Sequence, residues 1–222
     1  MTAGHFGLAA AVKSPAPRVP LWALMLSTYL LDFVFIILVA AGVESFAPLH
    51  PGQPAAYGQV LIQAFYSHSL VGAALIAVIA ALLAGRAWGQ RAAVVIGAVV
   101  FSHWILDLLV HRPDLPILPG NAGNLPLLGL GLWNFPVVSA AIELAFVVGG
   151  AYLYYRSALQ AALSPAHTRA VTAAAVTGLL LLLLLMSDVL AMPFIIPILL
   201  MVLLIVLSGW LDSRLNWSLR AT

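Results

Sequence analysis

Long runs of apolar residues, separated by short polar or glycine- and proline-rich stretches, dominate the chain. A helix needs about 20 apolar residues to cross the hydrocarbon core of a bilayer. Six runs reach or approach that length, and the pattern therefore predicts six membrane-spanning helices. The runs cover approximately residues 21–43, 59–84, 92–111, 135–155, 170–191 and 193–211. Met192-Pro193 separates the last two runs, where the sequence is compatible with a tight helical hairpin or with one kinked helix.

Composition narrows the class of protein. Of the 222 residues, 64% are hydrophobic and 7% are charged, whereas soluble domains carry about 25% charged residues. We therefore expect an all-α, polytopic membrane bundle whose first partner is the lipid bilayer. A net charge of +2 without a basic patch argues against nucleic acid as a partner. Cysteine is absent, which excludes disulfides, thiolate nucleophiles and cysteine metal ligands.

Basic residues indicate the orientation of the bundle. All but one of those near the predicted spans fall on a single side: Lys13, Arg18, Arg86, Arg91, Arg156, Arg169, Arg214 and Arg220. Arg112 is alone on the other side. The positive-inside rule then predicts that both termini are cytoplasmic.

The runs also suggest a division of the chain. We expect a cytoplasmic tail over residues 1–20, a four-helix membrane core over 21–156, and a C-terminal helical hairpin with a short tail over 157–222. His5, His50 and His167 lie outside the spans, and we expect them to be solvated. Two long non-cytoplasmic connections, 44–58 and 112–134, are either lids or simple connectors. The small pair Gly149-Gly150 permits close helix contact and is compatible with a homodimer.

Ionisable residues inside the spans are the main clue to function. His103 and Asp107 are one helical turn apart in the segment Phe101-Ser102-His103-Trp104-Ile105-Leu106-Asp107. Charged groups are costly in lipid, so such residues need partners or a metal. Asp32, His68 and Glu143 lie in three other predicted spans. At 1.5 Å per residue, all of these residues fall at a similar depth in the outer half of the bilayer.

The residue types point to a metal. Imidazole nitrogen and carboxylate oxygen suit zinc, manganese or iron. His111 follows one turn after Asp107 and could reach a second metal if the helix unwinds before Pro113. Two metals about 3.5–4 Å apart suit hydrolysis of a phosphate ester by an activated water. Either Glu143 or Asp32 could act as a general base if it is not a ligand.

Other roles for the same residues remain open. His103 and Asp107 could be a hydrogen-bonded pair that supports helix packing, and Asp32 with Glu143 could form a proton or cation path. The protein would then be a transporter, or an accessory subunit without catalysis. Arg112, near the outer rim, could bind a phosphate or anchor the helix at the interface.

The order of these motifs resembles a known family. An Asp in the first span, Ser67-His68-Ser69 in the second and His103-x-x-x-Asp107 in the third resemble the membrane-bound metal-dependent hydrolases, which include LexA-regulated inner-membrane members. The segment Leu132-Trp133-Asn134-Phe135-Pro136 is similar to the Trp-Pro stretch of that family. The resemblance covers about residues 21–155. That family has been compared with zinc-dependent phospholipase C.

The resemblance implies a function and a ligand set. It implies a helical site with two or three zinc ions that hydrolyses phosphate esters, in a bacterial inner membrane. A phospholipid or polyprenyl-phosphate substrate would explain a site that is buried in a membrane. The implied metal ligands are Asp32, His68, His103, Asp107, His111 and Glu143. The chain departs from the family by reading Leu31-Asp32 in place of Pro-Asp, and by lacking the His-Arg that precedes the second-span motif. A non-catalytic relative would show such losses.

Overall fold

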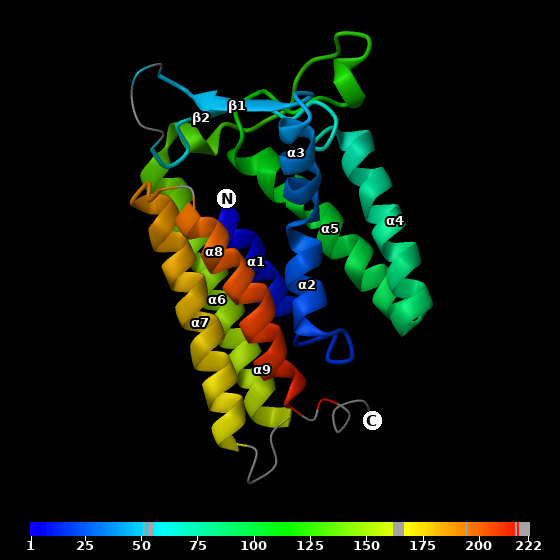
Figure 1. The fold of residues 1–222 in the computed structure, drawn as a ribbon, viewed down its shortest axis with the longest axis vertical. Coiled ribbons are helices and arrows are strands. Elements are labelled where there is room, and N and C mark those ends of the chain that lie inside the picture. Colours follow the sequence, from blue (N-terminus) through cyan, green and yellow to red (C-terminus); the bar gives the residue numbers. More distant parts are fainter. Residues whose placement is uncertain (51, 53–55, 162–166, 194, 216, 218–222) are drawn as a thin grey trace.

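The computed structural model describes residues 1–50, 52, 56–161, 167–193, 195–215 and 217, and is helical over most of that length (Figure 1). Its elements in chain order are α1 (Thr2–Val12), α2 (Leu21–Thr28), α3 (Leu30–Ala40), β1 (Ser45–Pro48), β2 (Val60–Gln63), α4 (Leu70–Trp88), α5 (Gln90–Val110), η1 (Pro119–Asn121), η2 (Leu132–Asn134), α6 (Pro136–Ala161), α7 (His167–Val189), α8 (Ile195–Leu203), the π-helical turn η3 (Leu204–Ser208) and α9 (Gly209–Ser213).

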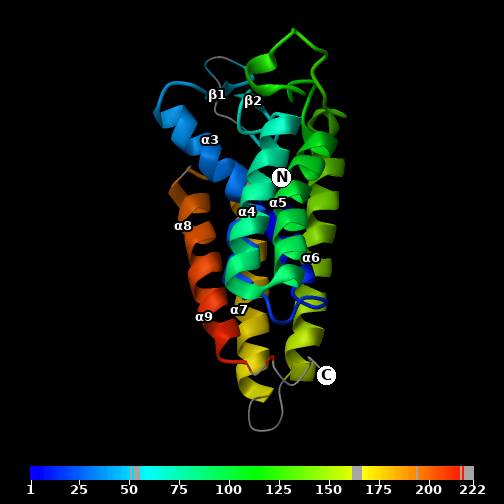
Figure 2. The same cartoon turned by 90° about the vertical axis from the view of Figure 1, so that its right-hand side faces the viewer.

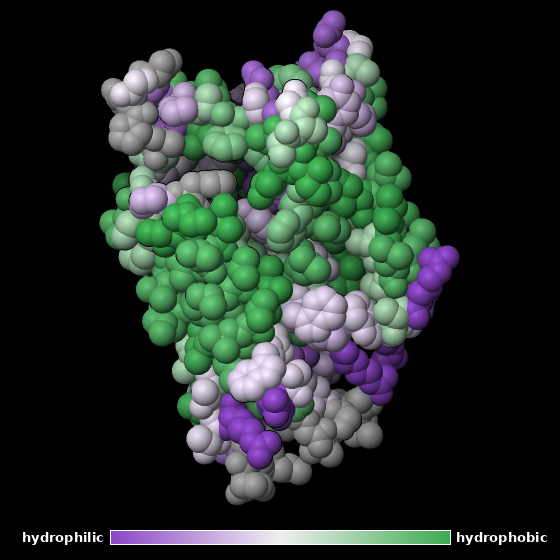
Figure 3. Space-filling model, in the orientation of Figure 1, coloured by the Kyte–Doolittle hydropathy of each residue, from purple (hydrophilic) through white to green (hydrophobic). Residues whose placement is uncertain are grey.

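The long helices are those of a membrane protein. Five helical stretches are long and apolar enough to cross a bilayer: α4, α5, α6, α7 and the run from α8 to α9. Helices α2 and α3 form a sixth span if they are taken together, with a bend of 49° between them. Figure 3 shows an apolar flank, with polar residues gathered toward the two ends of the molecule. The all-α prediction is confirmed, whereas the sidedness of the membrane stays a prediction.

Two predicted spans differ in detail from the observed elements. The first is broken at Tyr29, between α2 and α3. The second, predicted from residue 59, begins instead as strand β2, which pairs antiparallel with β1. Helix α4 starts only at Leu70, because the Ser69 side chain caps it by accepting a hydrogen bond from the Gly72 N–H at 3.0 Å. The segment 64–69 is thereby free to fold as a turn.

The last two spans form a hairpin. Helix α7 ends at Val189, and Ala191 adopts a positive φ of 49° in the turn that follows. Helices α8 and α9 then return beside α7 (Figures 1 and 2). Of the two arrangements that the sequence permits at Met192-Pro193, the structure has the tight hairpin.

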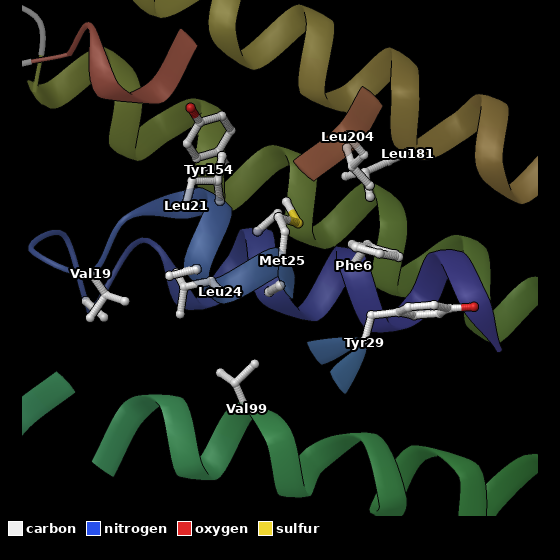
Figure 4. Close-up of a cluster of buried hydrophobic side chains, with 14 of the residues drawn as sticks. Phe6, Val19, Leu21, Leu24, Met25, Tyr29, Val99, Tyr154, Leu181 and Leu204 are labelled. Carbon is white, nitrogen blue, oxygen red and sulfur yellow. The ribbon is translucent and has the colours of Figure 1, made fainter. Parts of the chain in front are cut away.

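Helix α1 is the least expected element, because it lies inside the bundle and not in solvent. It packs on α6, α2, α7 and α5. A helix that is apolar all round is typically buried, and Phe6, Ala9 and Ala10 have no exposed surface. Phe6 stacks on Tyr29 with ring centroids 5.4 Å apart, within the core drawn in Figure 4. Helix α1, which belongs to the segment predicted as a tail, is thus part of the packed core.

Small residues let α1 approach α6 closely. A Cβ added to Gly7 would collide with the backbone of α6 at Phe146, and one added to Gly150 would collide with the backbone of Gly7. Contact of this kind between helix backbones requires glycine. The Gly149-Gly150 pair, read from the sequence as compatible with a dimer contact, thus contributes Gly150 to packing within the chain.

Candidate metal centre

Helix α5 carries the first two residues of the site. His103 and Asp107, four residues apart on one face, are 0% and 4% exposed. His103 Nε2 lies 3.0 Å from Asp107 Oδ2. The i,i+4 spacing therefore brings the two side chains together as the sequence predicts.

Two further elements add Asp32 and His68. The break at Tyr29 starts α3 anew, with Asp32 in its first turn, and His68 lies in the turn just before α4. His68 Nε2 is 3.3 Å from Asp32 Oδ1 and 3.3 Å from His103 Nε2. One ligand atom each from Asp32, His68 and His103 lie within 4.8 Å of one another, an arrangement that could hold a metal ion.

Helix α1 adds a residue that the sequence analysis missed. His5, predicted to be solvated, is 1% exposed, so that prediction is wrong. Its Nε2 lies 3.1 Å from Asp107 Oδ1, and its ring stacks on His103 with centroids 3.9 Å apart. His5, His103 and Asp107 form a second group whose ligand atoms lie within 4.8 Å of one another. The charge-free run of small apolar residues around Gly4-His5 was the available signal.

Hydrogen bonds at Nδ1 orient three of the histidines. His103 Nδ1 donates to the Thr28 carbonyl oxygen at 2.6 Å, and His111 Nδ1 donates to Asp114 Oδ1 at 2.8 Å. His68 Nδ1 lies 2.8 Å from Ser67 Oγ. Carbonyl and carboxylate oxygens only accept hydrogen bonds, so a neutral ring bound to either carries its proton on Nδ1.

The opposite nitrogens of these three rings face one carboxylate. The Nε2 atoms of His103, His68 and His111 lie 3.0, 3.5 and 3.9 Å from Asp107 Oδ2. With the ring protons on Nδ1, lone pairs of nitrogen and oxygen point at one another. Such a collection of buried acceptors is stable only when a cation or protons lie between them. An Nδ1 atom fixed by an outer partner is also typical of metal-binding histidines.

Glu143 lies apart from both candidate metal groups. It is fully buried, but its Oε1 accepts from the Gly4 N–H at 3.0 Å and its Oε2 from the Tyr57 hydroxyl at 2.7 Å. Burial and the neighbouring Glu143 carboxylate raise the pKa of Tyr57, which therefore stays a donor. Among the described residues, neither three-residue group includes Glu143. Its visible effect is to hold the start of α1, next to His5.

His111 and Arg112 occupy the end of α5. The helix ends at Val110, and His111 is extended, in contact with Trp133 at a centroid distance of 4.4 Å. Arg112 donates to Asn134 Oδ1 at 2.9 Å and to the Gly58 carbonyl oxygen at 2.9 Å. Arg112 therefore joins the ends of the two long connections, at Gly58 and Asn134.

Comparisons with known proteins identify no relative. No protein-family model, curated protein or solved structure matches the chain.

Proposed function

We propose that the protein is an integral-membrane, metal-dependent hydrolase of phosphate esters. The observation that carries the proposal is the convergence of buried imidazole Nε2 atoms and carboxylate oxygens on Asp107, with the ring protons held on the far side. Two three-residue groups share His103, whose free Nε2 atom can bind one ion, so the two groups are alternative positions for a single metal. Imidazole and carboxylate donors favour zinc, with manganese or iron as alternatives.

The residues of the two candidate groups would bind the metal, and the metal would activate a water molecule. A bound divalent metal lowers the pKa of a water molecule and polarises a phosphoryl oxygen. Asp32, His68 and His103 would hold the ion, and Asp107 Oδ2, 3.0 Å from His103 Nε2 and 3.5 Å from His68 Nε2, would supply a fourth donor. The Asp32 side chain is 25% exposed, whereas those of His103 and Asp107 are 0% and 5% exposed, so water and substrate would reach the ion from the side of Asp32.

An apolar groove supports a lipid as the substrate. The groove, of about 550 Å³, runs between the α2–α3 pair and the α4–α5 pair. Trp22 and Trp88 meet edge to face at one end of it, with ring centroids 5.8 Å apart. Ile96, which lines it, is two helical turns before His103 on the same face of α5. A hydrocarbon chain in the groove would lie alongside the helices that carry the site.

These features extend the expectations from the sequence. A phospholipid or polyprenyl phosphate has both the chain and the phosphate ester that the site requires. The bacterial inner membrane is the location that the family resemblance implies, and the apolar helices are compatible with it.

Elemental analysis of detergent-purified protein tests the proposal. We expect near-stoichiometric zinc, manganese or iron in the wild type, and loss of both metal and lipid phosphate hydrolysis in His103→Ala and Asp107→Ala. The matched control is His167→Ala, because His167 is exposed at the start of α7, and it should keep both. A folded wild type that stays free of metal after metal-replete purification would refute the hydrolase proposal. Proton or cation flux in proteoliposomes would then be measured.

A further inference from the structure

Glu44 is a buried carboxylate that lies outside the candidate metal groups. It lies between α3 and β1 and is only 4% exposed. Its Oε1 accepts from the backbone N–H groups of Tyr66 and Ser67 at 2.7 and 2.9 Å. Its Oε2 accepts from the Ser67 hydroxyl at 2.8 Å. Three hydrogen bonds thus tie Glu44 to the turn that carries His68.

The β-hairpin sets this contact. Strands β1 and β2 pair antiparallel with Ser45 opposite Gln63. Glu44 precedes that pair on one strand, and the turn with Ser67 follows it on the other. A slip of the register by one residue would turn side chains to the opposite face of the hairpin. The pairing of β1 with β2 therefore places the Glu44 carboxylate beside this turn.

The hydroxyl proton of Ser67 determines which nitrogen of the neutral His68 ring carries a proton. Ser67 has a single hydroxyl proton, and the structure directs it to Glu44. The Ser67 oxygen, 2.8 Å from His68 Nδ1, must then accept from that nitrogen. The ring proton is thereby held on Nδ1, and the Nε2 lone pair faces Asp32 and His103 at 3.3 Å each.

We propose that Glu44 is a positioning residue that acts through Ser67 to keep the Nε2 atom of His68 unprotonated and available to a metal. The inference deepens the proposed function, since it rests on the same metal site. The tautomer itself is a property of the metal-free protein and can be measured without any metal. The backbone of the turn has its own support, because the Trp104 indole donates to the His68 carbonyl oxygen at 2.9 Å.

Glu44→Gln reverses the direction of two hydrogen bonds, the one between residue 44 and Ser67 and the one between Ser67 and His68, with almost no change of side-chain shape. The amide oxygen can still accept from the two backbone N–H groups, so the new NH2 group faces Ser67 and donates to its oxygen. Ser67 must then donate to His68 Nδ1, and the ring proton moves to Nε2, which can no longer bind a metal. Ser67→Ala removes the hydroxyl group that links residue 44 to His68, but it does not reverse the direction of these hydrogen bonds. We therefore expect the glutamine variant to be the more damaging of the two.

The first measurement is ¹⁵N NMR of imidazole nitrogens in metal-free, detergent-purified protein, with His68→Gln used to assign the signals. The wild type should show His68 with a protonated Nδ1. In Glu44→Gln Nδ1 should lose its proton, and in Ser67→Ala the preference for a protonated Nδ1 should weaken. An unchanged His68 pattern in folded Glu44→Gln would overturn the inference.

The second measurement is zinc affinity. Loss of an outer partner of a metal-binding histidine typically weakens metal binding about 10–100-fold, and we expect that loss in Glu44→Gln. Ser45→Ala is the matched control, because it removes only the Ser45 hydroxyl bond to Gln63 Oε1, at 2.9 Å, in the same hairpin. Equal losses of zinc affinity in both variants would attribute the effect to the hairpin and would contradict the action of Glu44 through Ser67. A wild type that binds none of zinc, manganese and iron would refute the proposed function, and the NMR comparison would still decide the tautomer.

Discussion

The two ends of α1 carry two different kinds of buried polar cluster. At its C-terminal end, Lys13 Nζ lies 3.0 Å from Asp212 Oδ2 and donates to the carbonyl oxygens of Pro17 and Val19 at 3.0 and 2.9 Å. Asp212 also accepts from the Tyr154 hydroxyl at 3.1 Å. Near its N-terminal end, by contrast, His5 joins carboxylates and imidazoles whose lone pairs converge.

The difference separates a structural cluster from a candidate binding site. In the Lys13 cluster each charge has an opposite charge and hydrogen-bonding partners, so nothing further needs to bind. Burial lowers the pKa of Lys13, and the Asp212 carboxylate opposes that effect. In the His5 cluster, the Nε2 atoms of His103 and His68 face the Asp107 carboxylate, and a cation or protons would complete them. A buried ion pair is therefore not by itself a sign of function.

Asp212→Ala should give the largest loss of stability. It leaves Lys13 buried without its counter-ion, and breaking a buried pair in this way costs about 3–5 kcal/mol. Denaturant unfolding of the detergent-purified protein would measure the loss. The double variant Lys13→Met with Asp212→Leu removes both charges and should recover most of the stability. If the double variant were as unstable as the single one, the lone charge would not be the cause.

His5→Ala should weaken metal binding at the other end of the helix. It removes the His5 contact to Asp107 but leaves Asp32, His68 and His103 in place. We expect one equivalent of metal per chain to be retained with an affinity lowered about 10–100-fold, as measured by elemental analysis and zinc titration beside His167→Ala. Complete loss of the metal would place the ion in the His5–His103–Asp107 group instead.

Glu143→Gln should have the smallest effect of the three. The amide can still accept from the Gly4 N–H, so α1 stays in place, and an altered hydrogen bond to Tyr57 costs about 1 kcal/mol. Metal content should stay at the wild-type level, because the Glu143 oxygens bind Gly4 and Tyr57. Tyr57→Phe, which removes the same hydroxyl contact, should lose a similar amount of unfolding free energy. A glutamine variant without metal would place Glu143 among the ligands after all.

Much of the site could be read from residue type and spacing. The one-turn spacing of His103 and Asp107 fixes their common face, and both Asp32 and His68 join them. Depth along a helix gives only one coordinate, however, and the direction in which a side chain points depends on packing. Glu143 lies on a neighbouring helix, but it turns to Tyr57 and to α1 and joins neither candidate metal group.

The two elements that the sequence did not predict, helix α1 and strand β2, are short. Helix α1 has 11 residues, too few to be recognised as a span, and its burial depends on contacts with helices far away in the sequence. Val60–Gln63 is as apolar as the helix that follows, and apolar composition alone does not separate a buried strand from a helix. The acceptor role of Glu44 depends on that strand pairing, so it could not be read without the structure.

The close approach of Gly7 to Gly150 has a consequence for biosynthesis. Helix α1 is translated early, but the helix backbone that it touches comes more than a hundred residues later, and its buried counter-ion at Asp212 later still. The His5 segment therefore leaves the ribosome before the helices that bury it have been made. Its contacts with His103 and Asp107 reach their final packing only after α6 is in place.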